Sequence, residues 1–410
     1  MTIKDQTGSE TNLLPKAIGY LSAAPRVSTR MNSEAGGPRS HILGTISAFE
    51  ALGWSVYPYI VGDKIPEDLQ RNSRQVLESS FLFRIISDIV RILLGLLHSF
   101  LAWRDLHTKT DWVYERSAVF QALGWIFQTK KRLWIIETSA LYYYEASVER
   151  KSIAFKGLAR LIEKWAYKKC DVLVCVSDQL KQIIIKDFVI QPEKIIVVPN
   201  GVDCERFNPE GLKPLRLFNS PTIGFVSALV KWHHLEILLE AIAELKSSGI
   251  EYNLAVIGEG PMRLPWQKLA KELGLSRNTS FPGQIAWDKV PAYIAGFDLG
   301  FIGNDVMDLG VMYHSPLKLY EYMSMAVPVV STEFPDSIKM VSNGKNGYLF
   351  PAGNVGKLAQ TLIKAYEHRD SWLEMGKNAR NTILEQASWV SRVKRMIIEI
   401  ESLQGLEKWK

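Results

Sequence analysis

The sequence predicts an α/β protein made of two doubly wound, Rossmann-like domains that face each other across a cleft. Strand-like apolar runs alternate with helical patterns along most of the chain, which is typical of parallel sheets covered by helices on both faces. This alternation occurs in two series, separated by the polar, proline-bearing stretch Pro209–Pro221. A length of 410 residues fits two or three domains.

The amino-acid composition limits the kinds of ligand that the protein is expected to bind. Hydrophobic residues make up 47% of the chain, and 49 Lys and Arg are interspersed with 43 Asp and Glu, for a net charge of +6. This mild excess does not indicate a nucleic-acid binder, and it suits anionic ligands such as nucleoside diphosphates, or an anionic membrane surface. The three cysteines lack metal-type spacing, and the polar first 15 residues show no signal peptide. We therefore expect a cytoplasmic protein, with the inner face of the membrane as a further location.

The first series begins with a strand at Lys16–Tyr20, a loop at Ser22–Ser40 and a helix at His41–Leu52. Gly36 and Gly37 fall in that loop, where they suit close approach by a ligand, although a plain flexible loop explains them equally well. The later elements expected in this series are strands at Ser55–Val61, Trp112–Arg116, Leu133–Glu137, Asp171–Ser177 and Ile195–Val198, and helices at Phe81–His107, Ala118–Thr129, Ser152–Lys169 and Asp178–Asp187.

The second series follows the same pattern and ends in a helix without a strand after it. Its expected strands are Thr222–Ser227, Tyr252–Gly258, Thr279–Pro282, Leu299–Ile302, Val327–Ser331 and Gly347–Phe350. Its expected helices are Leu235–Ser247, Met262–Leu273, Pro291–Gly296, Lys318–Met325, Asp336–Ser342, Val355–His368 and Trp389–Leu403. We expect domains at residues 1–208 and 209–385, and a final helical segment, 386–410, that returns to the first domain. In doubly wound sheets, ligands bind beyond the carboxyl ends of the strands.

The segment Ser315–Ser331 predicts a loop, a helix that opens near Pro316, and a buried strand. The amino end of such a helix offers free amides and partial positive charge, which suit a diphosphate. Lys318 adds a full positive charge within that first turn, and Glu321 could accept hydrogen bonds from ribose hydroxyls. An ordinary solvated Lys–Glu pair explains the same two residues equally well.

Two further turns lie at predicted carboxyl ends of strands. Gly258 and Gly260 follow the strand Tyr252–Gly258 in a Gly-x-Gly turn, a pattern that is weak alone and also fits a tight β–α turn. Ser227–His234 follows the first strand of the second series. Lys231 and His233 in this segment supply basic groups where a phosphate would lie.

Together and in order, these pieces resemble the retaining glycosyltransferases of family 4, which have the two-domain GT-B fold. The segments that carry the resemblance are Asp111–Arg116, Trp134–Glu145, Val197–Pro209, Ser227–His234, Leu254–Pro261, Phe281–Gly283, Asp298–Ile302 and Ser315–Ser331. The resemblance as a whole covers about residues 16–400. Each motif alone is loose, but the ordered set is specific.

The resemblance implies transfer of a sugar from a nucleoside-diphosphate sugar, such as a UDP- or GDP-hexose, to a glycan, lipid or small-molecule acceptor, with retention. It implies that the diphosphate is held by Lys318 with Lys231 or His233. The implied donor-binding residues are Glu321, Ser315, Pro316, Leu317, Gly258, Gly260, Ser227, Gly36 and Gly37. On the acceptor side it implies Glu137, Ser139 and Arg116.

Four positions depart from the family pattern. A second glutamate that the family often has eight residues before the helix one corresponds to Tyr313, and the usual arginine of the phosphate loop corresponds to Ala228. His234 stands where the phosphate loop usually has glycine. A histidine often found after a strand of the first domain is replaced near Glu137 and Ser139.

No Asp-x-Asp element is present, so we expect no metal and no other cofactor. Positioned cations and helix amides can stabilise a leaving diphosphate without a metal. Two alternatives remain: a sugar-nucleotide epimerase, which can share the two-domain architecture, and a non-catalytic partner subunit whose donor site has decayed.

The segment from Phe81 to Trp103 combines Leu, Ile, Phe and Trp with Arg84 and Arg91. Its most apolar part, Ile85–Trp103, is interrupted by polar residues and falls short of an uninterrupted membrane span. An amphipathic helix with basic flanks could lie on a membrane near a lipid-linked acceptor. Packing of this helix on the sheet of the first domain is the alternative.

Overall fold

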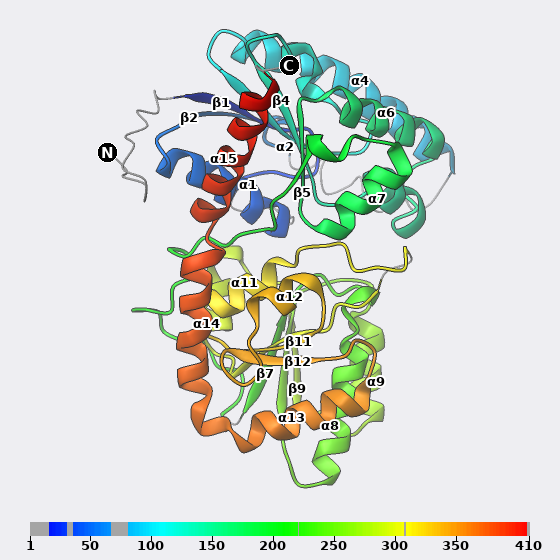
Figure 1. Cartoon of the computed structure of the whole chain (residues 1–410). Coiled ribbons are helices and arrows are strands. Elements are labelled where there is room, and N and C mark those ends of the chain that lie inside the picture. Colours follow the sequence, from blue (N-terminus) through cyan, green and yellow to red (C-terminus); the bar gives the residue numbers. More distant parts are fainter. Residues whose placement is uncertain (1–15, 31–35, 67–80, 220, 307–308, 408–410) are drawn as a thin grey trace, which may run out of the picture. The chain divides into compact units, whose positions relative to one another are not determined.

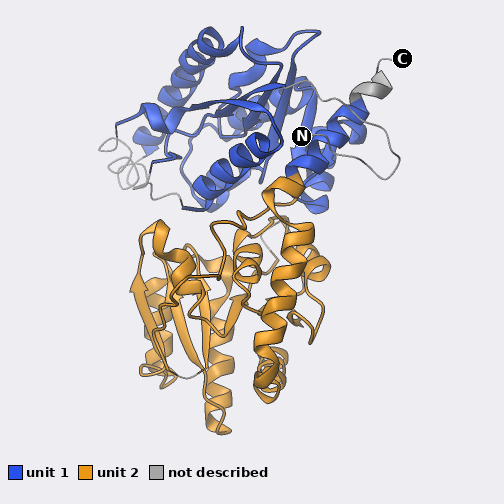
Figure 2. Cartoon of the chain, turned by 90° about the vertical axis from the view of Figure 1, so that its left-hand side faces the viewer, with its two compact units in different colours: residues 1–198, 393–410 blue, residues 199–392 orange. Residues whose placement is uncertain are grey.

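The computed structural model describes residues 16–30, 36–66, 81–219, 221–306 and 309–407 (Figure 1). The polar first 15 residues, which entered the signal-peptide expectation, lie outside the described part. The chain divides into two compact units, residues 1–198 with 393–410, and residues 199–392 (Figure 2). Each unit contains one six-stranded, fully parallel sheet, which confirms the prediction of two α/β domains.

Unit 1 has the strand order β2-β1-β3-β4-β5-β6. Its strands are β1 (Ala17–Ser22), β2 (Ser55–Ile60), β3 (Trp112–Arg116), β4 (Leu133–Thr138), β5 (Val172–Cys175) and β6 (Ile195–Val197). Its helices are α1 (Gly36–Ala51), α2 (Val61–Lys64), α4 (Phe81–Leu106), α5 (Tyr142–Tyr144), α6 (Lys156–Lys169) and α7 (Asp178–Phe188). Short 3-10 or π turns are η1 (Leu123–Phe127), η2 (Glu145–Glu149) and η3 (Pro192–Lys194).

The order of these strands decides which helices share a face of the sheet. Because parallel crossovers are right-handed, α4, α6 and α7 cover one face, and α1 covers the other. Helix α15 (Trp389–Glu407) begins in unit 2 and belongs to unit 1 from Val393 onward. Lys16 and Glu401 form an ion pair that joins this helix to the start of β1.

Unit 2 has the strand order β12-β11-β10-β7-β8-β9. Its strands are β7 (Thr222–Val226), β8 (Asn253–Ile257), β9 (Thr279–Gly283), β10 (Leu299–Ile302), β11 (Val329–Thr332) and β12 (Gly347–Phe350). Its helices are α8 (Leu235–Ser247), α9 (Arg263–Glu272), α10 (Val290–Ile294), α11 (Leu317–Ser324), α12 (Pro335–Met340), α13 (Val355–Glu367) and α14 (Trp372–Gln386). Short 3-10 turns are η4 (Lys231–His233), η5 (Trp287–Lys289) and η6 (Arg369–Ser371).

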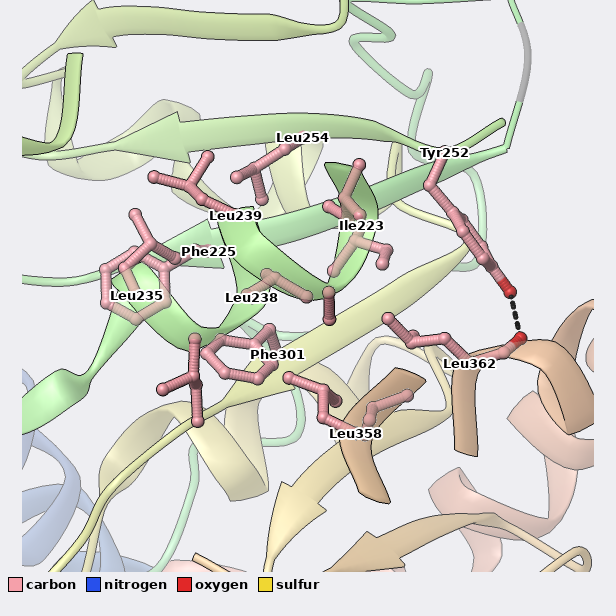
Figure 3. Close-up of a cluster of buried hydrophobic side chains, with 14 of the residues drawn as sticks. Ile223, Phe225, Leu235, Leu238, Leu239, Tyr252, Leu254, Phe301, Leu358 and Leu362 are labelled. Carbon is pink, nitrogen blue, oxygen red and sulfur yellow. Dashed lines mark hydrogen bonds between the residues drawn. The ribbon is translucent and has the colours of Figure 1, made fainter. Parts of the chain in front are cut away.

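One of the two buried clusters of unit 2 lies between this sheet and helices α8, α9 and α13, and the other contains residues of α10, α11 and α14. Figure 3 shows Phe225 and Phe301 from neighbouring strands packed with Leu238 and Leu358 from the helices. The hydroxyl of Tyr252 donates a hydrogen bond to the backbone oxygen of Leu362 (2.9 Å), so the polar end of this buried ring is satisfied.

The segment that joins the two series packs entirely with unit 2. The backbone N–H of Val202 donates to the oxygen of Ala387, and Phe207 lies in the same buried cluster as α11 and α14. The units therefore part at residue 198, ten residues before the domain boundary expected at 208.

Two local predictions were wrong, and one helix was not predicted. Residues 118–129 form only the short turn η1, because the buried Glu115 carboxylate accepts the N–H groups of Leu123 and Gly124 (2.6 and 2.7 Å). Gly36 and Gly37 are the first two residues of α1 rather than part of a loop. Helix α14 was missed, because its apolar positions are few and lie between charged and amide side chains.

Candidate functional site

The candidate donor site lies in unit 2, where the carboxyl ends of β7, β8 and β10 meet the amino end of α11. Pro316 has extended backbone angles and precedes the first helical residue, Leu317. Both residues are partly exposed, so the tip of α11 is not sealed inside the protein. The first amides of any helix lack intrahelical partners and favour an anion.

Ser315, just before this tip, is buried and engaged inside unit 2. Its hydroxyl accepts the N–H of Asn200 (3.0 Å) and donates to the buried carboxylate of Asp336 (2.5 Å). The Asn200 side chain also donates to the backbone oxygen of Ser315 (2.6 Å). These bonds fix the start of α11 to the Val197–Pro209 segment, and a contact of Ser315 with a donor stays a prediction.

Lys318 is only 5% exposed, and the end of its side chain contacts the ring of His233. The distance between Lys318 Nζ and His233 Nδ1 is 2.9 Å, and that between His233 Nε2 and Ser227 Oγ is 2.8 Å. The ammonium also lies 4.5 Å from the centre of the Phe225 ring. Three predicted site residues from two segments far apart in the sequence thus form one hydrogen-bonded series.

Burial controls the charge of this series. It lowers the pKa of Lys318 well below its usual range, although Glu321 opposes the shift. Burial, and then Lys318, also lower the pKa of His233 well below its usual range, while Asn304 opposes this. In the absence of an anion, the site therefore disfavours positive charge on Lys318 and on His233. A bound anion such as a diphosphate would favour the protonated form of Lys318, because opposite charges attract.

Glu321 lies one turn along α11 and is partly exposed. Burial raises the pKa of its carboxyl to about 7, against the opposing effects of Arg206 and Lys318. Carboxylates with strongly raised pKa values are common at functional sites. At neutral pH, Glu321 can change its protonation state when a ligand binds.

Gly258 and Gly260 allow two loops to touch. Their φ angles are +134° and +157°, and a Cβ atom would lie 1.9 Å from the Ser227 oxygen or 2.4 Å from the Leu229 oxygen. The N–H of Leu229 donates to the oxygen of Glu259 (2.9 Å), which locks the loop after β7 to the loop after β8. The packing of these loops explains both glycines, and contact with a nucleotide stays a prediction.

The segment after β7 forms the single turn η4. Lys231 in this turn is exposed, whereas His233 is buried within it. His234 follows with φ +44°, the left-handed conformation that favours glycine. Its Nδ1 lies 3.1 Å from Glu236 Oε1, and that hydrogen bond raises the pKa of His234.

Sequence reasoning missed two residues of this site. Arg206 was quoted only as part of the Val197–Pro209 motif, yet its charge lowers the pKa of Glu321. Asn304 follows β10, is buried at 3% exposure, and its side chain interacts with His233. The position of Asn304 directly after a predicted strand was the sequence feature that could have indicated a site residue. The positions that depart from the family pattern differ in exposure: Tyr313 is fully buried and Ala228 is exposed.

The candidate acceptor residues lie in unit 1 at the carboxyl ends of β3 and β4. Glu137 is buried, and its Oε1 is 2.7 Å from Nε2 of His41 in α1. Burial would raise the pKa of Glu137, but His41, Arg116 and Tyr114 together lower it. The structure thus brings Glu137 and Arg116 into one charged cluster and adds His41, which the sequence analysis did not single out.

Ser139 lies just beyond this cluster. Its Oγ is 3.0 Å from the hydroxyl of Tyr142, and its side chain is partly exposed. Gly36 and Gly37 open α1, the helix that carries His41. These residues give unit 1 a polar edge at the carboxyl ends of its strands, the edge where doubly wound sheets bind ligands.

Comparison with known proteins agrees with this picture. Residues 35–206 match the family described as Glycosyltransferase Family 4, and residues 213–382 match the family described as Glycosyl transferases group 1. An uncharacterized glycosyltransferase of Methanocaldococcus jannaschii is 26% identical over 295 residues, which are 69% of this chain and 73% of that protein.

Two other similar proteins have more specific names. A GDP-mannose-dependent alpha-(1-6)-phosphatidylinositol monomannoside mannosyltransferase of Mycobacterium tuberculosis is 26% identical over 205 residues, 47% of this chain and 52% of that one. The chain thus spans about half of the length of this relative. The structure of Anabaena HepE in complex with UDP shares the fold, with a TM-score of 0.61, 15% identity, and coverage of 94% of this chain and 100% of that chain.

Proposed function

The chain belongs to the family 4, group 1 glycosyltransferases, and from this premise we propose that it moves a hexose from a nucleoside-diphosphate sugar to a glycan, lipid-linked or small-molecule acceptor, with retention. The observation that carries the proposal is the hydrogen-bonded series Lys318–His233–Ser227 beside the open tip of α11. The UDP in the Anabaena complex and the GDP-mannose in the name of the mycobacterial relative support a nucleotide-sugar donor.

In this proposal the diphosphate of the donor binds at the first turn of α11, next to Lys318. When the bond between the anomeric carbon and the diphosphate oxygen breaks, negative charge develops on the leaving group. A protonated Lys318 and the helix amides stabilise that charge. Lys318 donates to Nδ1 of His233, so the ring carries its proton on Nε2 and donates it to Ser227 Oγ. This arrangement holds the ammonium in place.

The remaining residues have supporting roles in the proposal. Glu321 accepts hydrogen bonds from the ribose hydroxyls, and the exposed Lys231 adds positive charge near the diphosphate. In unit 1, Gly36 and Gly37 supply helix amides, while Glu137, Ser139 and Arg116 contact the acceptor. The Glu137–His41 contact, at 2.7 Å, supports this assignment because burying a carboxylate costs free energy unless its surroundings or its function compensate.

We further propose that transfer needs no metal and takes place in the cytoplasm. Lys318 and the α11 amides support the first point, because they can take the place of a divalent cation at the leaving group. The thiols of Cys170, Cys175 and Cys204 are free, and burial raises the pKa of all three, that of Cys170 to about 12. Three cysteines that form no disulfide support a reducing compartment.

A thermal-shift panel of UDP-, GDP-, ADP- and TDP-sugars, with and without EDTA, tests the donor site on the full chain. We expect one nucleotide series to raise the melting temperature and EDTA to leave the shift unchanged. Lys318→Met and Glu321→Ala should each remove the shift, because they delete the diphosphate and ribose contacts. Lys268→Met and Glu272→Ala, on the exposed face of α9, are matched controls and should keep it.

Product analysis then separates the alternatives. Transfer predicts a glycosylated acceptor, whereas conversion of the donor sugar without any acceptor would identify an epimerase. If none of the nucleotide sugars changes the melting temperature, the result would contradict the proposal and favour a non-catalytic subunit. The buried Tyr313 in place of a second glutamate is the observation that keeps this last alternative in the test.

A further inference from the structure

Helix α4 has its apolar face outward, the reverse of a helix on a soluble domain. Its outer stripe consists of apolar residues at helical spacing, each 46% exposed or more: Leu82, Ile86, Ile89, Leu93, Leu96 and Phe100. Its inner face instead buries Asp88, Gly95 and His98. A continuous exposed stripe of this kind marks an interaction site, because water disfavours it.

The inner face of α4 is bonded to the rest of unit 1. The carboxylate of Asp88 accepts the N–H groups of Ala154 and Phe155 (2.7 and 3.0 Å). The Tyr59 hydroxyl lies 2.9 Å from Nδ1 of His98. A Cβ atom at Gly95 would lie 2.3 Å from the side chain of Gln121. By length and composition α4 could cross a membrane, contrary to the sequence expectation, but these contacts would be lost if it did.

The neighbouring helix α6 continues the outward apolar surface. Leu158, Leu161 and Trp165 are exposed, and the Trp165 ring lies 6.2 Å from that of Trp125 in η1, which packs on α4. The segment whose N–H groups donate to Asp88 leads directly into α6. Figure 1 shows α4 and α6 next to each other on unit 1. Tryptophan is enriched where proteins meet the boundary between lipid and water.

The exposed charges of α6 are of one sign. Lys156, Lys168 and Lys169 are exposed and Lys164 is partly exposed. The single acidic residue of this helix, Glu163, is buried and accepts the N–H groups of Tyr142 and Tyr143. On α4, Asp88 is buried and paired with Arg91, and Asp105, at the end of the helix, is paired with Arg104. The combined surface is therefore apolar with a basic border.

We propose that the outer faces of α4 and α6 dock unit 1 on an anionic lipid bilayer, with α4 lying in the interface plane. Apolar side chains enter the acyl boundary while the α6 lysines meet anionic headgroups. A second copy of the chain fits less well, because a two-fold interface would bring the same lysines together. This inference goes beyond the proposed transfer reaction and rests on unit 1 alone.

Vesicle flotation of the full chain tests the docking surface. The vesicles contain phosphatidylcholine alone, or with about a third of phosphatidylglycerol to give an anionic surface. We expect binding to the anionic vesicles that weakens as salt increases. Leu93→Glu with Leu96→Glu should weaken vesicle binding at least about tenfold, because both changes would place a negative charge at the acyl boundary. Lys164→Glu with Lys168→Glu should weaken binding and reduce its dependence on salt.

Matched controls make the outcome decisive. Leu264→Glu with Leu373→Glu changes two leucines of unit 2 that are more exposed than Leu93 and Leu96, and it should leave vesicle binding unchanged. The nucleotide thermal shift of each variant reports the donor site separately, so loss of vesicle binding is distinguishable from loss of donor binding. A wild-type chain that binds neither vesicle overturns the proposal, and so does a dimer in light scattering that Leu93→Glu with Leu96→Glu dissociates.

Discussion

Glu321 sets a pH dependence at the scale of a single residue. Its folded pKa of about 7 lies above the ordinary value of 4.5, so its contribution to stability is fully present below about pH 4.5 and is lost as pH rises through 7. Glu321→Gln imitates the protonated form. We expect this variant to be more stable than the wild type by about 1–3 kcal/mol at about pH 8.5 and equally stable at about pH 4.5. Urea denaturation at both pH values measures the difference.

The same residue should show a trade-off between stability and binding. If the ionised Glu321 accepts the ribose hydroxyls, the Gln variant loses nucleotide affinity at about pH 8.5 although it gains stability. Glu272→Gln, at an exposed position of α9, should change neither property. A Glu321→Gln variant that is less stable than the wild type at about pH 8.5 would show that the carboxylate is stabilised rather than penalised by its surroundings.

At the scale of elements, the turn between β7 and α8 carries identifiable strain. His234 has φ +44°, which costs a non-glycine residue about 1–2 kcal/mol, and its partly exposed pair with Glu236 compensates by under about 1 kcal/mol. The raised pKa of His234 means that the pair contributes most below about pH 6.5 and fades at higher pH. We expect His234→Gly to stabilise the protein by about 0.5–1 kcal/mol at about pH 9 and by less at about pH 6.

Chemical denaturation of His234→Gly beside His234→Ala checks this assignment. The alanine variant keeps the left-handed backbone and loses the pair, so it should be less stable than the glycine variant at both pH values. Equal stability of the two variants would show that the backbone at this position carries no strain.

The elements that sequence patterns predicted are those whose periodicity reflects burial. Strand Leu299–Ile302 and helix Leu235–Ser247 have the predicted bounds, since their apolar residues all face the core. The helix predicted at residues 118–129 was wrong. The carboxylate of Glu115, which lies outside this segment, accepts the N–H groups of Leu123 and Gly124. Side-chain-to-backbone bonds of this kind leave no periodic signal in a sequence.

For the candidate donor site too, the sequence predicted some features and the folded structure was needed for others. Lys318 and His233 were predicted separately from local motifs, and the structure joins them although they are 85 positions apart. The lowered pKa values of Lys318 and His233 could not be predicted, because both depend mainly on burial in the folded unit. Ser315 was predicted as a ligand-binding residue, yet its bonds to Asn200 and Asp336 exist only in the folded unit. Sequence indicated which residues matter, and packing determined what each one does.

At the scale of the whole molecule, the two units have separate sheets and separate cores, so a nucleotide bound at α11 should stabilise unit 2 selectively. At a concentration about 100 times its Kd, a ligand adds about 2.7 kcal/mol to the unit that binds it. We expect amides of β7, β8 and β10 to exchange hydrogen up to about 100-fold more slowly with nucleotide present, and those of β1, β3 and β4 to be unchanged. Hydrogen exchange with mass spectrometry measures both sets in one sample, and Lys318→Met under the same conditions should abolish the protection. Equal slowing in both units would contradict selective stabilisation, because it requires either cooperative unfolding of the chain or a nucleotide contact outside unit 2.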